Sequence, residues 1–193
     1  MPWERDPKEL PDNYQQALAK LINTERRLKR NLEHADVYQS RIDDLVERGC
    51  ARKLTADEKK SHGGPVHYIS HHAVIRPEKK TTPCRVVFNS AANYKGHVLN
   101  DYLMKGPDLL NSMLAVMLKF REEAVGYVGD VSKMYRYQVL VDPDIDGHTH
   151  RYLWRDMNTN RPPDVYIKLV LTFGDRHSPA IANMAMDLTA EEH

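Results

Sequence analysis

One carboxylate of this sequence stands where it could hold a metal ion. Asp130 interrupts residues 122 to 141, "EEAVGYVGDVSKMYRYQVLV", whose valines, tyrosines and glycines are otherwise typical of a buried strand. An ionised carboxylate is costly in apolar surroundings unless a positive group meets it. Asp130 is therefore either a ligand of a cation such as Mg²⁺, which takes one or two carboxylates together with substrate phosphate oxygens, or a strand-end residue that caps the following turn.

The position of a nearby aromatic residue bears on this choice. Tyr135 follows Asp130 in the predicted turn, and the strand pattern resumes at Tyr137. Nucleotide polymerases present their first metal ligand as an Asp at a strand end, before a tight turn that carries an aromatic side chain. The spacing alone is common by chance, so the surrounding motifs must decide.

Other groups of possible metal ligands are less complete. The segment "DPDIDG", residues 142 to 147, matches the start of an EF-hand loop, but the twelfth position holds Leu153 instead of a bidentate Glu. We expect a solvated acidic turn there. The ten histidines have no C-x-x-C motif beside them, and adjacent His71 and His72 would point to opposite faces of a strand. We expect them to be structural or surface residues.

Two helices are predicted in the first fifty residues. The apolar stripe of the first helix comprises Leu18, Leu21, Ile22, Leu28 and Leu32. Its basic residues, which could contact phosphate or form a solvated face, are Arg26, Arg27, Lys29 and Arg30. The second helix is predicted from Asp36 with Gly49 as its C-terminal stop. Its inward residues are Ile42, Leu45 and Val46.

Strand patterns begin after "HGGP". The segments "VHYISHHAVIRP" and "CRVVF" predict a hairpin with "PEKKTTP" at its tip. Four later strands are predicted over "AVGYVGD", "YQVLV", "RYLWR" and "VYIKLVL".

Two further helices are predicted. The segment "GPDLLNSMLAVMLKFRE" should be a helix with a core-facing stripe of Leu110, Met113, Leu114, Met117 and Leu118. The segment "SPAIANMAMDL" should begin a helix, with Ser178 as N-cap and Pro179 at the first helical position. Its expected buried stripe is Ile181, Met184, Ala185 and Leu188.

Composition limits the class of protein. The chain has 193 residues, 41% hydrophobic and 28% charged, with a formal net charge of +1, which suits a globular protein. Its two cysteines are too few for a disulfide framework, and no apolar run approaches the roughly 20 residues of a membrane span. The opening "MPWERDPKEL" has no signal-peptide core. We therefore expect an intracellular, cytoplasmic protein that is not secreted.

Several motifs in order carry a family resemblance. The set "RVVFNSAANYKGHVLND", "GPDLLNSMLAVMLKFR", "YVGDVSKMYRYQVLV", "RYLWR" and "FGDRHSPAIANMAM" resembles the reverse transcriptase domain of BEL/Pao-type LTR retrotransposons. The opening "PWERDPKELPDNYQQALAKLINTERRLKRN" is similar to the segment that leads into that domain. The resemblance covers essentially the whole chain. It implies an α+β fold with a helical leader (1–49), a fingers subdomain (50–121) and an incomplete palm (122–193).

The resemblance implies catalytic and metal-binding roles. Asp130 would be the catalytic aspartate of the first palm motif and a ligand of two Mg²⁺ or Mn²⁺ ions, together with the backbone carbonyl of Val131. Such ions bracket the attacking and leaving oxygens of nucleotidyl transfer. Tyr135 would be the aromatic gate that rejects a ribose 2′-hydroxyl.

The resemblance also implies nucleotide-binding residues. Arg85 would grip the triphosphate of the incoming dNTP, since a planar guanidinium suits bidentate phosphate contact. Lys79 or Lys80 at the hairpin tip could add charge. The residues that would pack against nucleotide and template are Phe173, Gly174, Ser178 and Pro179. The implied partners are an RNA or DNA template–primer and a dNTP.

The sequence departs from the family in one large respect. The second palm motif, Tyr-x-Asp-Asp, is absent from these 193 residues, and the adjacent Asp43 and Asp44 lie upstream on a predicted helix. A two-metal site would be under-coordinated, so we expect this polypeptide alone not to polymerise. It would be one piece of a larger polyprotein or a truncated gene product. Asn89 also replaces the Asp that usually follows the "RVVF" run, and "FGDRHSP" is more charged than its counterpart in the family.

Two other interpretations stay open. A non-catalytic remnant of a retrotransposon could bind nucleic acid or a protein partner through Arg85 and the lysine-bearing hairpin. Salt-sensitive binding without nucleotide incorporation would favour that interpretation. A gene fragment without a retained role would instead be unfolded or would aggregate, because an incomplete palm leaves strand edges exposed.

Overall fold

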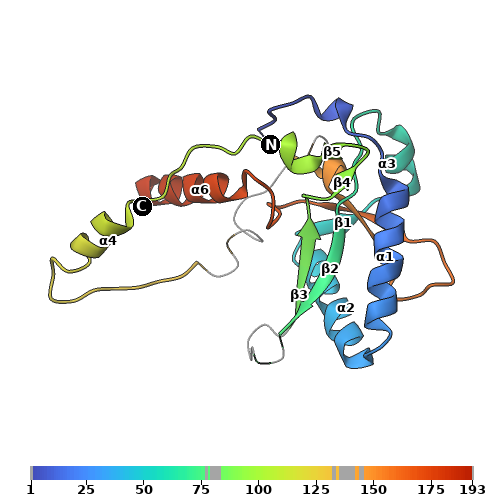
Figure 1. Cartoon of the computed structure of the whole chain (residues 1–193), viewed down its shortest axis with the longest axis horizontal. Coiled ribbons are helices and arrows are strands. Elements are labelled where there is room, and N and C mark those ends of the chain that lie inside the picture. Colours follow the sequence, from blue (N-terminus) through green and yellow to red (C-terminus); the bar gives the residue numbers. More distant parts are fainter. Residues whose placement is uncertain are drawn as a thin grey trace.

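The computed structural model describes residues 2–76, 78, 84–131, 134, 142–143 and 146–192. Helices and strands are mixed along this part of the chain, which confirms the α+β class. In Figure 1, α1 (Tyr14–Leu28) and α2 (Leu32–Glu47) lie beside the strands, and α4 (Met113–Lys119) and α6 (Ser178–Glu192) project from the other side of the body.

The two N-terminal helices form as predicted, with one shifted boundary. α1 buries Ala17, Leu21 and Leu28 at helical spacing. α2 begins at Leu32, earlier than predicted, because the side chain of Asn31 accepts a hydrogen bond from the backbone N–H of His34 at 3.0 Å. Leu32 is therefore exposed at a helix start and does not extend the stripe of α1.

The far end of α2 follows the prediction more closely. Gly49 stands just beyond the helix with a positive φ of 69°, as expected for a C-terminal stop. Ile42 and Leu45 are buried, but Val46 is 39% exposed, so its predicted inward position is wrong. The apolar stripe of α2 is narrow, because residues adjacent in sequence point about 100° apart on a helix.

The main sheet joins distant parts of the chain. β1 (Ala51–Lys53) pairs with β7 (Asp164–Lys168), which pairs with β6 (Arg151–Trp154), and both pairings are antiparallel. The predicted strands "RYLWR" and "VYIKLVL" are thus confirmed. The short 3-10 helix η3 (Gly147–His150) leads into β6, and α3 (Ala56–Ser61) follows β1.

The predicted hairpin is confirmed as an antiparallel pair. β2 (Ser70–Ile75) pairs with β3 (Cys84–Asn89), and α1 packs against β2 while α2 packs against β3. Most of the predicted tip, residues 77 and 79–83, lies outside the described residues. A smaller pair, β4 (Asn93–Tyr94) and β5 (His97–Val98), leads to the 3-10 helix η2 (Leu99–Asp101).

One hydrophobic core crosses the three segments that the resemblance implies. Its fully buried side chains include Tyr38 from α2, Leu99 from η2 and Trp154 from β6. The rings of Tyr38 and Trp154 meet edge to face with their centroids 5.5 Å apart. The boundaries at residues 50 and 122 are divisions of the sequence, and the core continues across both.

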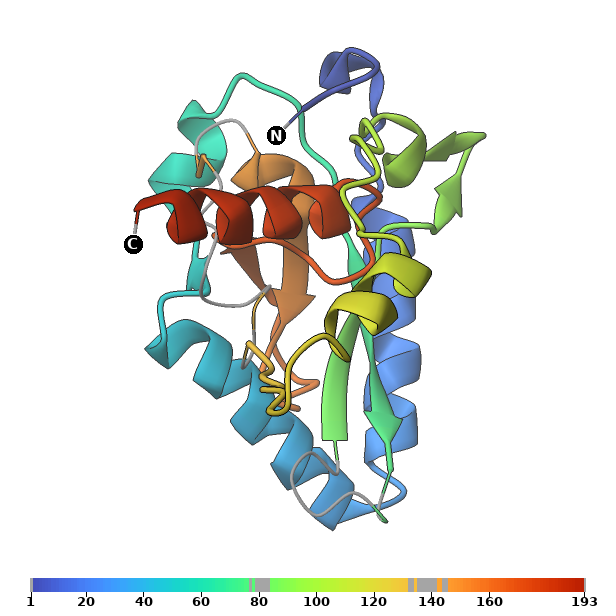
Figure 2. The same cartoon turned by 90° about the vertical axis from the view of Figure 1, so that its left-hand side faces the viewer.

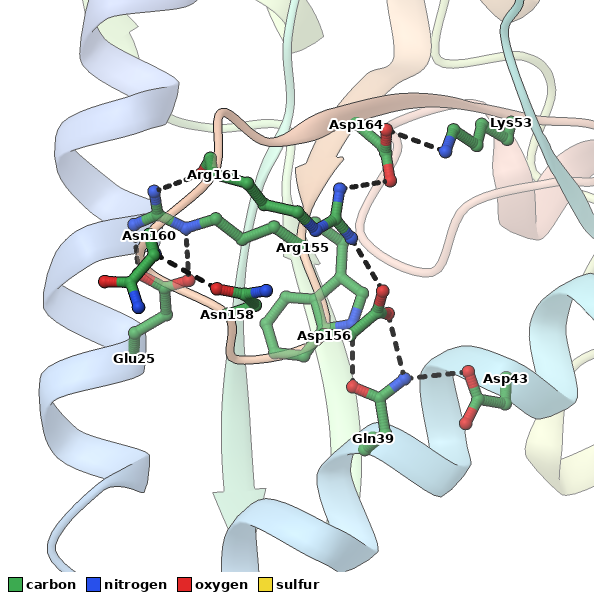
Figure 3. A network of polar contacts seen from close by, with 11 residues as sticks. Glu25, Gln39, Asp43, Lys53, Arg155, Asp156, Asn158, Asn160, Arg161 and Asp164 are labelled. Carbon is green, nitrogen blue, oxygen red and sulfur yellow. Dashed lines mark hydrogen bonds and ion pairs between the residues drawn. The ribbon is translucent and has the colours of Figure 1, made fainter.

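A polar network ties α1 and α2 to the connection between β6 and β7 (Figure 3). Arg155 donates to both carboxylate oxygens of Glu25 at 2.7 and 2.6 Å. From α2, Gln39 accepts the indole N–H of Trp154 at 3.0 Å and donates to Asp156 at 3.2 Å. Side chains from three elements are thereby held in one arrangement.

α4 differs from its prediction in burial. The stripe predicted to face the core is 48% to 76% exposed and comprises Leu110, Met113, Leu114, Met117 and Leu118. The helix is also shorter than predicted, with seven residues. Its apolar spacing indicates a helix correctly, but among the described residues no element packs closely against it, so the stripe has nothing to bury against.

The predicted strand "AVGYVGD" is wrong. Residues 125–131 have neither helix nor strand, and their side chains are exposed. A strand needs a neighbour to satisfy its backbone N–H and C=O groups, and no described strand pairs with this segment. The predicted strand "YQVLV", residues 137–141, lies outside the described residues.

α6 forms where predicted but buries a different set of residues. Ser178, Ala180 and Ala182 are buried, whereas Met184 and Leu188 are 48% and 58% exposed. Only the start of the helix therefore packs into the body, and Figure 2 shows α6 and α4 in front of the strands. Within the described parts of the chain, none of the helices combines the length and apolar character that a membrane span requires.

Candidate nucleotide-binding surface

Arg85 lies on the outer face of β3, where strand alternation places it. Cys84 and Val86 on either side of it are buried, so the side chain of Arg85 is on the solvent face. Its neighbour across the hairpin is Val74. No ion pair to Arg85 is found within the described part of the chain, so its guanidinium is available to an external phosphate.

A turn-rich loop, Thr172 to Ser178, carries the predicted residues Phe173 and Gly174. The N–H of Asp175 donates to the carbonyl of Thr172 at 3.1 Å, and the N–H of Ser178 donates to the carbonyl of Asp175 at 3.2 Å. Phe173 is 72% exposed on this loop. An exposed ring on a hydrogen-bonded loop can stack on a nucleic-acid base.

Asn100 of η2 clamps this loop from outside. Its side-chain N–H donates to the carbonyl of Gly174, and its side-chain oxygen accepts the N–H of Arg176, both at 3.0 Å. Gly174 has a φ of 113°, which residues with a Cβ rarely adopt. A Cβ at this position would also lie 3.4 Å from the backbone oxygen of Phe88. The loop therefore lies close against the end of β3.

A buried carboxylate fixes the same loop from inside. Asp175 is 3% exposed, accepts a hydrogen bond from the hydroxyl of Ser90, and lies 3.1 Å from Nε2 of His150. Burial opposes its ionisation, but the attraction of His150 and the two hydrogen bonds outweigh burial, so the pKa of Asp175 lies below its ordinary value. The charged carboxylate links the loop to the β3–β4 turn and to η3.

Ser178 and Pro179 occupy the start of α6 but not in the predicted capping arrangement. The carbonyl of His177 accepts the N–H of Ile181 at 3.1 Å, which makes His177 the N-cap. The hydroxyl of buried Ser178 donates to the carbonyl of Thr172 at 2.9 Å instead of capping the helix. Pro179 is exposed in the first turn.

The structure does not bring the predicted metal ligands to this loop. Asp130 and Val131 are exposed in the segment without helix or strand, and no described contact joins Asp130 to Arg85 or Phe173. Asp130 does not lie in the apolar surroundings that the sequence predicts. Tyr135, Lys79 and Lys80 lie outside the described residues.

The described residues do not by themselves form a two-metal site. Asp130 offers one carboxylate, and the part of the chain that the structure describes holds no cluster of three or more His, Cys, Asp or Glu side chains suited to a metal ion. Catalytic Mg²⁺ needs carboxylates held together near the substrate phosphates. Among the described residues, Asp130 alone therefore does not supply the carboxylates that catalytic Mg²⁺ needs.

The segment that resembles an EF-hand loop is structural. Asp146 is 1% exposed, and its carboxylate accepts the indole N–H of Trp3 at 3.2 Å, so the predicted solvated acidic turn is wrong at this residue. The side chain of Asp146 is needed inside because it satisfies a polar group from the N-terminus. Asp142 is exposed, and Asp144 lies outside the described residues.

Sequence reasoning misses the residues that hold the loop. In the sequence Asp175 stands out only as an unusual charge within "FGDRHSP", and no pattern singles out Ser90 or Asn100. An Asp directly after an expected functional Gly is the available signal. Its partners cannot be found from the sequence, because Ser90 and His150 lie 85 and 25 residues away from Asp175.

Comparison with known proteins does not assign the chain to a family. No protein-family model matches the chain, and no curated protein matches it.

Proposed function

We propose that this chain is part of a retroelement RNA-directed DNA polymerase. In this proposal the β2–β3 hairpin belongs to the fingers, the segment from residue 122 belongs to the palm, and residues 1–49 form the leader. The order of the five sequence motifs supports the assignment. The proposed partners are a template–primer and a dNTP, in an intracellular setting.

One structural observation carries the proposal. The Thr172 to Ser178 loop is held against the end of β3, through Asp175 and Ser90 and through the close approach of Gly174 to Phe88. β3 carries the exposed Arg85. Arg85 stands near the start of β3 and the loop lies at its end, roughly 10 Å further along the strand. A guanidinium suited to phosphate and an exposed aromatic ring suited to a base thus stand on two elements in contact.

The catalytic roles are proposed for a complete active site only. Asp130 and the carbonyl of Val131 would bind Mg²⁺ or Mn²⁺, and Tyr135 would exclude ribonucleotides. The segment of Phe173, Gly174, Ser178 and Pro179 would pack against nucleotide and template, with buried Ser178 holding it through the carbonyl of Thr172. The present 193 residues contain no Tyr-x-Asp-Asp motif. The polypeptide alone is therefore proposed to bind nucleic acid without extending a primer.

A binding experiment with matched variants tests the proposal. Fluorescence anisotropy would measure the affinity of the full chain for a labelled RNA–DNA template–primer, with and without dNTP. Arg85→Ala should weaken dNTP-dependent binding by about tenfold, as expected for one lost charge-assisted contact. Arg48→Ala, at the exposed end of α2, serves as the control and should change it less than twofold.

Two results would count against the proposal. Absence of template–primer binding at low salt would remove its basis, and equal effects of Arg85→Ala and Arg48→Ala would show that Arg85 has no special role. A primer-extension assay with Mg²⁺ or Mn²⁺ tests separately whether the polypeptide alone is inactive as a polymerase. Synthesis by the wild-type polypeptide would show that the missing motif is dispensable.

The second candidate, a non-catalytic nucleic-acid-binding remnant, is favoured by one observation. Among the described residues, Asp130 belongs to no group of three or more His, Cys, Asp or Glu side chains that could hold a metal ion, whereas Arg85 and Phe173 are both exposed. Such a remnant would bind template–primer with steep salt dependence but would show no response to dNTP. The dNTP arm of the same experiment therefore separates the two candidates.

A further inference from the structure

A second group of cationic and polar side chains lines a cavity away from the Phe173 loop. The cavity has a volume of about 90 Å³ and lies between the end of α1, the start of α2 and β2. Arg27, His34 and His72 provide its polar lining, and Ala73 and Ile75 contribute apolar wall. These residues come from three elements, so only the folded chain forms the cavity.

The described lining is rich in hydrogen-bond donors. Among the described residues, no carboxylate lines the cavity and no ion pair to Arg27 is found. The hydroxyl of Thr24 is engaged, since it donates to the carbonyl of His71 at 3.1 Å. Because alternate residues of an antiparallel strand direct their backbone groups to the same edge, the N–H of Ala73 is directed to the same side as that carbonyl.

We propose that this cavity binds a phosphate group. The cavity offers an Arg guanidinium, two imidazoles and a backbone N–H, and the oxygens of a tetrahedral oxyanion accept hydrogen bonds from such groups. A volume of about 90 Å³ corresponds to roughly three water molecules, which leaves room for a phosphate group but not for a whole nucleotide. The ligand is therefore a terminal or bridging phosphate whose remaining atoms lie outside.

The surroundings favour a phosphate of a nucleic-acid backbone, and this part of the inference rests on the proposed function. Arg26 is exposed beside Arg27 in the last turn of α1, and Lys29 and Arg30 are exposed just beyond the end of the helix. Successive phosphates of one strand could pair with such a row of cations. The cavity would then fix one phosphate in position while the surrounding charges hold its neighbours.

A pair of adjacent variants tests the cavity directly. Arg27→Ala removes the lining guanidinium, and Arg26→Ala removes an exposed guanidinium from the same helix turn that does not line the cavity. NMR of the imidazole protons would follow His34 and His72 during titration of the full chain with inorganic phosphate, at constant ionic strength set with chloride. We expect saturable shifts of both histidines, about tenfold weaker in Arg27→Ala and unchanged in Arg26→Ala.

The outcomes are distinct. Saturable shifts that Arg27→Ala weakens establish the site, and their absence, or equal loss in both variants, overturns it. A labelled single-stranded oligonucleotide then identifies the source. Greater loss of affinity in Arg27→Ala than in Arg26→Ala assigns a backbone phosphate, whereas equal loss assigns free phosphate and refutes the backbone assignment. If no oligonucleotide binds at all, the proposed function fails while the phosphate titration still decides the site.

Discussion

Arg155 and Glu25 lie 130 residues apart in the sequence and form a two-point ion pair, with both N–H···O distances below 2.8 Å. The side chains are 10% and 2% exposed. The pair joins the end of β6 to α1, so it connects the C-terminal half of the described fold to the N-terminal helices (Figure 3). The hydrogen bonds to Glu25 raise the pKa of Arg155 above its ordinary value, so the guanidinium stays charged.

Loss of one partner from this pair should be strongly destabilising. Glu25→Gln leaves a charged Arg155 without its counter-ion in a buried place, and we expect the free energy of unfolding to fall by about 3 kcal/mol. Glu9→Gln is the control, because Glu9 and Arg5 form an exposed pair with side chains 56% and 49% exposed. It should cost less than about 0.5 kcal/mol. Urea denaturation measures both, and equal costs would show that the buried pair contributes nothing special.

Gly174 should tolerate no side chain. Its φ of 113° opposes a Cβ, whereas the carbonyl oxygen of Phe88, 3.4 Å from the position that a Cβ would occupy, would be only in van der Waals contact with it. We expect Gly174→Ala to lower the free energy of unfolding by about 1–3 kcal/mol. Gly63→Ala is the matched control, since nothing lies within 4 Å of a Cβ there. If thermal denaturation gives the same midpoint for both variants, Gly174 does not hold this positive φ in solution.

The buried histidines should make the fold sensitive to acid. Burial lowers the pKa of His67, His71, His148 and His177 to about 4 from an ordinary value of 6.5. Between these values the unfolded chain binds protons that the folded chain does not. The free energy of unfolding is therefore highest above pH 6.5, where these histidines are neutral in both states, and it falls as the pH falls toward 4.

Asp175 extends this loss to lower pH. Its folded pKa lies below the ordinary 3.8, so its contribution to the free energy of unfolding is present above pH 3.8 and disappears as the pH falls through the folded value.

The contribution of the histidines is measured by urea denaturation between about pH 7.5 and about pH 4.5. A free energy of unfolding that stays flat over this interval would show that these histidines are not buried as neutral groups.

Two leucines of opposite burial provide a test of the α4 region. Leu114 on α4 is 68% exposed and Leu153 on β6 is 2% exposed. Leu153→Ala should cost about 2–5 kcal/mol because it removes buried contacts and leaves a cavity. Leu114→Ala should change the free energy of unfolding by less than about 0.5 kcal/mol. A large cost at Leu114 would mean that α4 packs against the body in solution.

Local sequence patterns were sufficient to place several elements, but they did not predict β1, α3, β4 or β5. The periodicity of α1, the two strands of the β2–β3 hairpin, and strands β6 and β7 all appear where the patterns predict them. The solvent-facing position of Arg85 also follows from alternation along β3. The same reasoning failed for Met113, Leu114 and Leu188, because an apolar stripe indicates which face could be buried but not whether another element covers it.

By itself, the sequence determined the type and order of seven elements, since a period of 3.6 or 2 is a property of neighbouring residues; they are α1, α2, β2, β3, β6, β7 and α6. It also supplied the proposed polymerase resemblance. Only the tertiary structure decided which polar groups meet: Asp175 with Ser90, Glu25 with Arg155, and Arg27 with His72 around one cavity. These residues are far apart along the chain, and their approach depends on how the whole core packs, which no local spacing records.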